Sequence, residues 1–354
     1  MRESTRPVAT VVRLVSLLLL PSIGCRDVDQ AVGVSPSRSL SVTQNIAFAR
    51  ILQGRLFDIF IVSENGVGLV NLTDHAANDL NPRWSPDGAS IAFESNREGS
   101  PNIFVMPAAG GLALNVTRFE RSARECSWYP DGASIAFVGE TVQSFDIYRA
   151  NINDSTITNL TQGRGANHYP RCSPDGSMIA FVSNRSNNWS LYVMASDGSN
   201  VRSLTEITGF DETFTLKWSP DSRFLLFNLN MGGARDVFVI KNNGTEKRNL
   251  TNHPSDDVYG DWSPDGHWIV FQSNRSGKNA VYRMSEFGTD VAKISKGEDD
   301  RFPSFSPNGL WVMFLSARRG AYEIWLVDPG GIEEFIVAPT EISDLTPRWK
   351  PTTH

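Results

Sequence analysis

Three of the five histidines in this 354-residue chain stand in polar segments that precede short β-type runs. They are His75, His168 and His253. Neutral imidazole is a common ligand of divalent transition metals, so histidines that converge on one point would create a metal centre. However, no two of the three are close enough in sequence to form a ligand pair on one element. A metal site is therefore the alternative interpretation, and the sequence predicts no cofactor.

A second set of polar residues recurs in step along the chain. An aspartate or asparagine stands three positions before a proline, or before the residue in its place, at Asp79, Asn167, Asp257, Asp300 and Asp344. Arginine recurs in a Ser-x-Arg pattern at Arg97, Arg185, Arg275 and Arg318. Gathered on one face, these side chains would form a mixed-charge ring that binds a polar or peptide ligand. The alternative is structural, because Asp and Asn at loop ends fix turns and a recurring arginine can bridge neighbouring units.

An internal repeat defines the elements that must position these residues. The motif Trp84-Ser85-Pro86-Asp87-Gly88 returns in variant form along the chain, and a truncated copy, Trp349-Lys350-Pro351, ends the series. Successive prolines of the motif are 44, 44, 46, 44, 43 and 44 residues apart. A spacing this regular indicates repeated structural units.

Each unit contains four short runs that are typical of β-strands. In one of the best copies they are the segment around Trp84, Ile91–Phe93, Ile103–Met106 and the region of Asn115. β-branched and aromatic residues fill these runs, and Gly, Asn, Asp and Pro bound them. Four-stranded units of roughly 40 to 45 residues are characteristic of propeller blades, whereas a β-sandwich does not repeat one sequence. We therefore predict an all-β propeller of four-stranded antiparallel blades.

The two ends of the chain contain complementary fragments of one unit. Ile46–Thr73 supplies the last three strands, and the segment around Trp349 supplies a lone first strand. Pairing of Pro347–Pro351 beside Ile46–Phe48 would join the fragments into one blade and remove the free sheet edges. Six continuous blades and this composite blade predict a seven-bladed ring over residues 45–354.

The predicted blade topology places the polar residues on one face of the ring. Loops that enter first strands and hairpins between second and third strands share that face, so the Asx residues, the arginines and the three histidines fall there together. The Ser-Pro-Asp-Gly turns lie on the opposite face. These turns are interpreted as structural, because Pro presets φ and Gly supplies a positive φ.

The repeat resembles that of the TolB-type propeller family, whose blades read Leu-Thr, Pro-x-Trp-Ser-Pro-Asp-Gly, Ile-Ala-Phe, Ser-x-Arg and Ile-Tyr-Val-Met. The best copies here are Trp84–Met106 and Ser173–Met194. The resemblance implies the propeller architecture, which hosts several functions, and does not name one of them. It also carries the alternative, since a metal-dependent oligogalacturonate lyase uses similar seven-bladed repeats. Similar propellers occur fused to peptidase domains, but this sequence has no Gly-x-Ser-x-Gly nucleophile motif.

The N-terminal residues have the layout of an export signal. Three arginines precede the apolar run Leu14–Leu20, which is too short to span a bilayer. The following Ser22-Ile23-Gly24-Cys25 resembles the cleavage box of bacterial lipoproteins, in which the cysteine is lipidated and becomes the new N-terminus. We expect residues 1–24 to be the signal and 25–44 a short linker. An ordinary secretory signal is the alternative.

The amino-acid composition limits the classes of partner that the chain can bind. The chain has 33 basic and 39 acidic residues, a net charge of −6 and no basic block, which argues against nucleic acid. Its three cysteines are too few and too scattered for a disulfide scaffold or a cysteine-rich zinc site. We predict a non-catalytic periplasmic or outer-membrane lipoprotein that binds a protein or envelope component and contacts the membrane only through its lipid. A metal-dependent carbohydrate-acting enzyme is the alternative.

Overall fold

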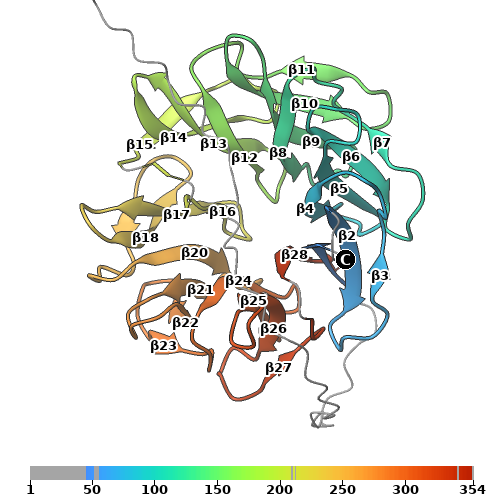
Figure 1. Cartoon of the computed structure of the whole chain (residues 1–354). Coiled ribbons are helices and arrows are strands. Elements are labelled where there is room, and N and C mark those ends of the chain that lie inside the picture. The colour runs from blue at the N-terminus through green and yellow to red at the C-terminus, as the bar shows by residue number, and fades with distance from the viewer. Residues whose placement is uncertain (1–44, 52–55, 209, 212, 341–342, 353–354) are drawn as a thin grey trace, which may run out of the picture. The chain divides into compact units, whose positions relative to one another are not determined.

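The computed structural model describes residues 45–51, 56–208, 210–211, 213–340 and 343–352, which all lie within one unit of the chain, residues 40–354. Their regular elements are 28 strands in seven four-stranded antiparallel sheets. Figure 1 shows these sheets as blades around a central axis. No helix in this described part has the length and apolarity needed to cross a bilayer. The predicted seven-bladed all-β propeller is confirmed, whereas the signal, the linker and Cys25 lie outside the described residues.

Each blade orders its strands outward from the axis. The composite blade contains β28 (Asp344–Trp349), β1 (Asn45–Ile51), β2 (Phe57–Ser63) and β3 (Val70–Asn71). The next three blades contain β4 (Asp79–Trp84), β5 (Ser90–Ser95), β6 (Asn102–Pro107) and β7 (Leu114–Asn115); β8 (Ser122–Trp128), β9 (Ser134–Glu140), β10 (Phe145–Asn151) and β11 (Ile157–Asn159); and β12 (Asn167–Cys172), β13 (Met178–Ser186), β14 (Asn188–Ala195) and β15 (Arg202–Glu206). The last three contain β16 (Leu216–Trp218), β17 (Phe224–Asn230), β18 (Arg235–Lys241) and β19 (Arg248–Asn249); β20 (Asp257–Trp262), β21 (Trp268–Ser273), β22 (Ala280–Ser285) and β23 (Ala292–Lys293); and β24 (Asp300–Phe305), β25 (Val312–Ser316), β26 (Glu323–Val327) and β27 (Glu334–Ile336).

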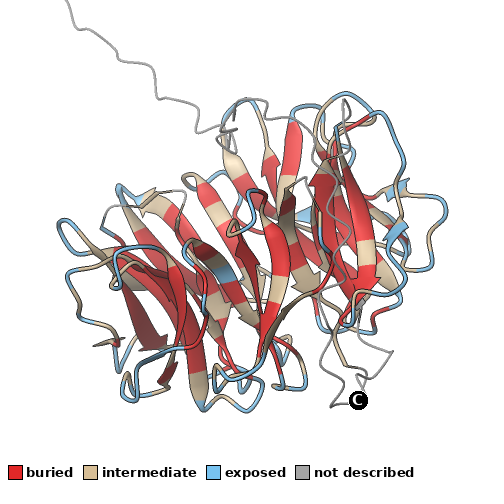
Figure 2. Ribbon diagram, turned by 60° about the horizontal axis from the view of Figure 1, so that its bottom comes forward, coloured by how far each residue is buried: buried red, intermediate tan, exposed pale blue. Residues whose placement is uncertain are grey.

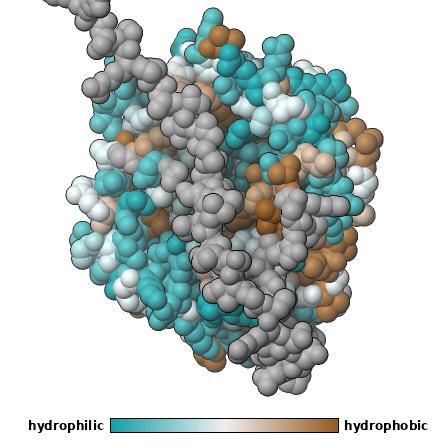
Figure 3. All heavy atoms as spheres, in the orientation of Figure 1, coloured by the Kyte–Doolittle hydropathy of each residue, from teal (hydrophilic) through white to brown (hydrophobic). Residues whose placement is uncertain are grey.

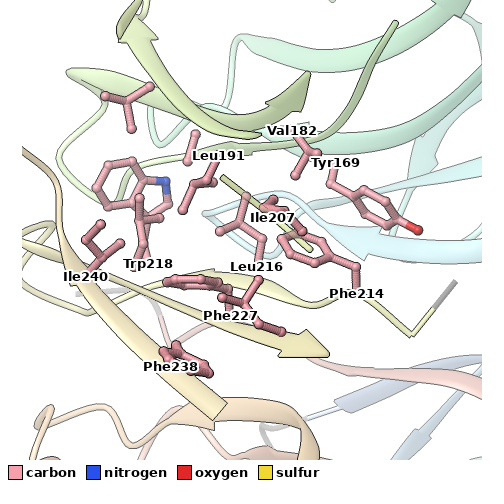
Figure 4. Close-up of a cluster of buried hydrophobic side chains, with 14 residues drawn as sticks. Tyr169, Val182, Leu191, Ile207, Phe214, Leu216, Trp218, Phe227, Phe238 and Ile240 are labelled. Atoms are coloured by element: carbon pink, nitrogen blue, oxygen red, sulfur yellow. The ribbon is translucent and has the colours of Figure 1, made fainter. Parts of the chain in front are cut away.

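The second strand of each blade is buried on both faces, because it lies between two neighbouring blades (Figure 2). In β5, Ile91, Ala92 and Phe93 are all fully buried. Ile91 and Phe93 pack with the composite blade, and Ala92 packs with the blade on the other side. Seven such hydrophobic clusters of described residues fill the seven gaps between blades. Figure 4 shows the cluster between the β12–β15 and β16–β19 blades.

The Ser-Pro-Asp-Gly turns are held by their own side chains. Ser85 donates a hydrogen bond to the Asp87 carboxylate, and the backbone N–H of Ala89 donates to the same oxygen. Gly88 takes a φ of 65°. The turn after β16 has Ser222 in the glycine position, with a φ of 62°. The turn therefore persists where an L-residue must adopt the left-handed conformation.

The connections divide between two faces of the ring. We call the face with the Ser-Pro-Asp-Gly turns the turn face; it also carries the connections from third to fourth strands, since the N–H of Ala108 donates to the carbonyl of Ala89. We call the opposite face the loop face. It carries the hairpins between second and third strands and the loops that enter inner strands, which meet where the N–H of Asn78 donates to the Asn96 side chain.

Strand β28 closes the ring against β1. Its register pairs Ile46 with Trp349 and Arg50 with Asp344, so the closing strand begins and ends earlier than the predicted Pro347–Pro351. A bulge opposite β1 explains the difference, because Thr346 takes a φ of 49° there and the pairing continues past Pro347 toward Asp344. One of the hydrophobic clusters joins the composite blade to the β24–β27 blade. Backbone pairing and side-chain packing therefore both close the ring.

Candidate functional site

The Asx residues of the predicted ring begin inner strands, but they do not face solvent. Each one is 0% exposed: Asp79, Asn167, Asp257, Asp300 and Asp344. Each accepts a hydrogen bond from an arginine of its own blade, at 2.9 Å for Arg97–Asp79, 2.9 Å for Arg185–Asn167, 2.7 Å for Arg275–Asp257 and 3.0 Å for Arg318–Asp300. The picture of a solvent-facing charged rim is therefore wrong, because the hairpin arginine folds down over the Asx side chain.

The arginines are fixed by aromatic rings as well as by the Asx residues. The Arg97 guanidinium lies 5.1 Å from the ring centre of Phe93 and 5.0 Å from that of Phe104, on the second and third strands of its own blade. Its Nε donates to Ser95 at 3.0 Å, which accounts for the Ser-x-Arg pattern. The same stack occurs at Arg185, Arg275 and Arg318. These arginines therefore hold a hairpin onto its own blade, whereas the structural alternative expected them to bridge two blades.

The composite blade builds the same arrangement from different chain segments. Arg50 of β1 donates to Asp344 of β28 at 2.9 Å and lies over the rings of Phe48 and Phe60. Burial raises the pKa of Asp344 to about 6, Arg50 opposes the shift, and the Glu323 carboxylate adds to it. The ring closure thus includes a carboxylate that is costly to ionise.

Asp257 shows the same cost. Burial raises the pKa of Asp257, although Ser273 and Arg275 stabilise its charged form. Within the part of the chain that the structure describes, one carboxylate oxygen each of Asp79, Asp257 and Asp300 has no hydrogen-bond partner. These positions support a role in holding the loop-face hairpins, and direct contact with a ligand stays a prediction.

The three histidines do not converge. His75 and His253 follow β3 and β19, the outermost strands of their blades, and their backbone N–H groups donate to Asp58 and Asp236. His168 lies instead on the inner strand β12, 3.8 Å from the Glu125 carboxylate. The convergence that the alternative metal site requires is not found for these three histidines, because the loop from fourth to first strand runs from the rim inward. No group of three His, Cys, Asp or Glu side chains that could hold a metal occurs among the described residues.

An aromatic cluster on the loop face was not predicted from the sequence. It consists of Phe145, His168, Tyr169, Trp189 and Phe210, with ring centres 5.2 Å apart for Phe145–His168, 5.8 Å for His168–Trp189, 5.8 Å for Tyr169–Phe210 and 4.5 Å for Trp189–Phe210. All but Tyr169 are partly exposed. The cluster joins three neighbouring blades, because Phe145 lies on β10, His168 and Trp189 lie on β12 and β14, and Phe210 precedes β16. The repeat did contain a signal, since Phe210 lies in the one unit whose proline spacing is 46 residues.

The inner strands also line the axis with basic side chains that sequence reasoning overlooked. Arg83, Arg171, Lys217 and Arg348 each stand one residue before the tryptophan or cysteine that ends an inner strand. The signal was present in the aligned repeats, but no local motif marks these residues. Only the ring brings them to one level.

The architecture defines the class: a seven-bladed propeller with turns on one face and a loop face that carries paired polar residues and aromatic side chains. The TolB β-propeller domain model matches residues 29–213 and 210–353, so the chain belongs to this family. A Tol-Pal system protein TolB from Syntrophus aciditrophicus is 46% identical over 41 residues, which are 12% of this chain and 9% of that protein. The match thus spans under a tenth of that relative.

Solved structures share the fold at low sequence identity. TolB from Acinetobacter baumannii is 19% identical with a TM-score of 0.57, over 88% of this chain and 67% of that one. An oligogalacturonate lyase in complex with manganese is 16% identical with a TM-score of 0.63, over 80% and 85%. A puromycin hydrolase is 12% identical with a TM-score of 0.66, over 85% and 52%. The same architecture therefore occurs in proteins with different activities.

Proposed function

We propose that this chain is an exported, non-catalytic propeller that binds a protein or another envelope component through its loop face, and that Cys25 anchors it to a membrane by a lipid. The observation that carries the proposal is the partly exposed aromatic cluster on the loop face. Family membership supports a binding scaffold, and the Tol-Pal relative supports an envelope location.

The aromatic cluster has the properties of an interface centre. Large aromatic side chains bury much area at little entropic cost and are enriched among the residues that dominate binding energy. Trp189 and Phe210 contact each other and remain partly exposed, so a partner would cover a surface that is already ordered. Beside them, Arg185 is fixed by Asn167 and two aromatic rings. The buried Asx–Arg pairs thus hold the hairpins in place, and the exposed aromatic edges make the contact.

Photocrosslinking in the bacterium that produces the protein tests this proposal. A photoreactive residue replaces Asn188, which is exposed beside Trp189, and a second version carries it at Asn243, exposed on the turn face. We expect a defined adduct from position 188 and none from position 243. The substitutions Trp189→Ala and Phe210→Ala should each lower the yield about tenfold.

The matched control is Phe287→Ala, which removes an aromatic ring that is 66% exposed on the turn face. It should leave the adduct unchanged. An adduct from position 243 alone, or one that Trp189→Ala does not affect, would contradict binding through the loop face.

The enzymatic alternative has support only from the fold of the oligogalacturonate lyase. It requires a bound metal, so metal analysis of the purified protein after exposure to manganese tests it. Stoichiometric manganese that His168→Ala removes would favour the alternative over the scaffold.

A further inference from the structure

Large apolar side chains are exposed where two neighbouring blades pass from their third strand to their fourth on the turn face. Residues 64–69 make this connection in the composite blade, and residues 108–113 make it in the next blade. The exposed fractions are 67% for Val67, 43% for Leu69, 46% for Val70, 77% for Leu112 and 58% for Leu114. We call these five residues the apolar edge. Figure 3 shows hydrophobic residues along the edge of the ring beside β3 and β7.

The apolar edge continues the hydrophobic cluster between its two blades. Leu72 of the composite blade and Ala108 and Ala113 of the next blade pack against that cluster. A methyl group on Gly110 would lie 3.8 Å from the Leu72 side chain, so the second connection lies against the end of β3. The two connections are therefore side by side.

Hydrogen bonds within each connection hold it in one conformation. The N–H of Gly66 donates to the carbonyl of Ser63 at 2.9 Å, and the N–H of Gly110 donates to the carbonyl of Pro107 at 3.0 Å. A connection that is already ordered loses little conformational entropy when a partner covers it. The exposed apolar side chains are thus presented on a preformed surface.

The two connections display no charged side chain. Glu64 begins the first one but is only 3% exposed, and residues 65–72 and 107–116 contain no Asp, Glu, Lys or Arg. Each of the other five blades has a charged residue in the equivalent connection, and these include Asp154, Asp197, Glu246, Asp290 and Glu333. The fold therefore accepts charge at this place. Its absence from two adjacent blades indicates a surface that contacts an apolar partner.

The N-terminal segment enters the propeller beside the apolar edge. Asn45, where the described residues begin, pairs with Ser63, which ends β2 and precedes the first connection. Nineteen residues lie between Cys25 and Asn45. They can span at most about 65 Å. A lipid on Cys25 would therefore keep the turn face of the composite blade within reach of the membrane.

We propose that the apolar edge lies on a lipid surface, with its side chains in the interface between head groups and acyl chains. The inference rests on the lipid anchor proposed for Cys25, because the anchor brings the edge to the membrane. Apolar side chains that enter this interface leave water, and a surface without displayed charge pays no penalty for removing charge from water. The loop face, on the opposite side of the ring, then remains accessible to a protein partner.

Vesicle flotation of the purified chain from Arg26 onward tests the proposal. This chain contains all 28 described strands but lacks both the apolar run Leu14–Leu20 and Cys25, so neither a signal segment nor a lipid contributes to its binding. The vesicles are made of phosphatidylcholine alone or of phosphatidylcholine with added phosphatidylglycerol. We expect binding to the neutral vesicles at least as strong as to the anionic ones, because the edge displays no charge and the chain is net negative.

The test variant is Val67→Ser/Leu112→Ser, which removes apolar side chains that are 67% and 77% exposed. The matched control is Val142→Ser/Met231→Ser, which removes side chains that are 83% and 57% exposed on loop-face hairpins. We expect the test variant to bind neutral vesicles about tenfold more weakly than wild type. The control should bind as wild type does. Circular dichroism should show that both variants fold, because all four side chains project from surface turns.

Sedimentation equilibrium distinguishes a lipid surface from a second copy of the chain. A monomeric wild type that floats with the vesicles supports the proposal. A dimer that Val67→Ser/Leu112→Ser dissociates, equal flotation of wild type and test variant, or no flotation of wild type would overturn it. None of these results concerns the anchor, which is tested separately by the mature N-terminus of the exported protein.

Discussion

Replacing Asp344 by asparagine should change how the stability of the propeller depends on pH. Asp344 is fully buried where β28 closes the ring, and its pKa is raised to about 6. In the unfolded chain the same carboxyl has an ordinary pKa near 4. Between these values the folded chain binds more protons than the unfolded chain, so this group stabilises the fold below pH 4, and its contribution is lost as pH rises to 6.

The size of the effect follows from the two proton affinities. A tenfold difference in affinity is worth about 1.4 kcal/mol, so a rise from about 4 to about 6 corresponds to roughly 3 kcal/mol. Asparagine removes this pH dependence and still accepts a hydrogen bond from Arg50. The propeller already contains that pairing, since Arg185 donates to Asn167 at 2.9 Å.

Urea unfolding followed by tryptophan fluorescence at pH 4, 5, 6 and 7 measures the effect. We expect the free energy of unfolding of Asp344→Asn, relative to wild type, to rise by roughly 3 kcal/mol from pH 4 to pH 7. The reciprocal control is Asn167→Asp, which puts a carboxylate against the carbonyls of Phe145 and Gly165 and should lose stability over the same range. A relative free energy that stays constant with pH would refute the reasoning.

Three further predictions concern closure, anchoring and the cysteines. Deleting residues 344–354 should lower the melting temperature by many degrees or cause aggregation, because the deletion exposes the β1 edge. The control deletion of residues 351–354 should leave the melting temperature unchanged. An unchanged melting temperature after the longer deletion would disprove closure by β28. Cys25→Ser should release the protein from the membrane, and mass spectrometry that finds a mature N-terminus other than Cys25 would show an ordinary secretory signal. Burial raises the pKa of both Cys126 and Cys172 to about 12. At pH 8 the two free thiols should therefore react with iodoacetamide at least about 100-fold more slowly in the folded chain than in the unfolded chain. Equal reaction rates in the two states would contradict this prediction.

The sequence by itself determined the architecture, because every unit repeats the same residue patterns for strands and turns. Alternating β-branched and aromatic residues specify the strands, and Pro with Gly or its substitutes specifies the turns, so neither depends on distant residues. The regular spacing and the complementary end fragments then gave seven blades and their closure. The position of the closing strand was less certain from sequence, because the bulge at Thr346 shifts the pairing without a local mark.

Only the tertiary structure decided which polar side chains are available for function. Asp257 and Arg275 look like a charged surface in sequence, but the strand register brings them together inside one blade, where Arg275 donates to one oxygen of the buried Asp257. His75 lies far from His168 because fourth strands are outermost and first strands innermost. Arg83 and Arg348 are 265 residues apart, and they approach only because the ring closes. The repeat places these residues at equivalent positions of their blades, and the closed ring determines which residues of other blades they contact.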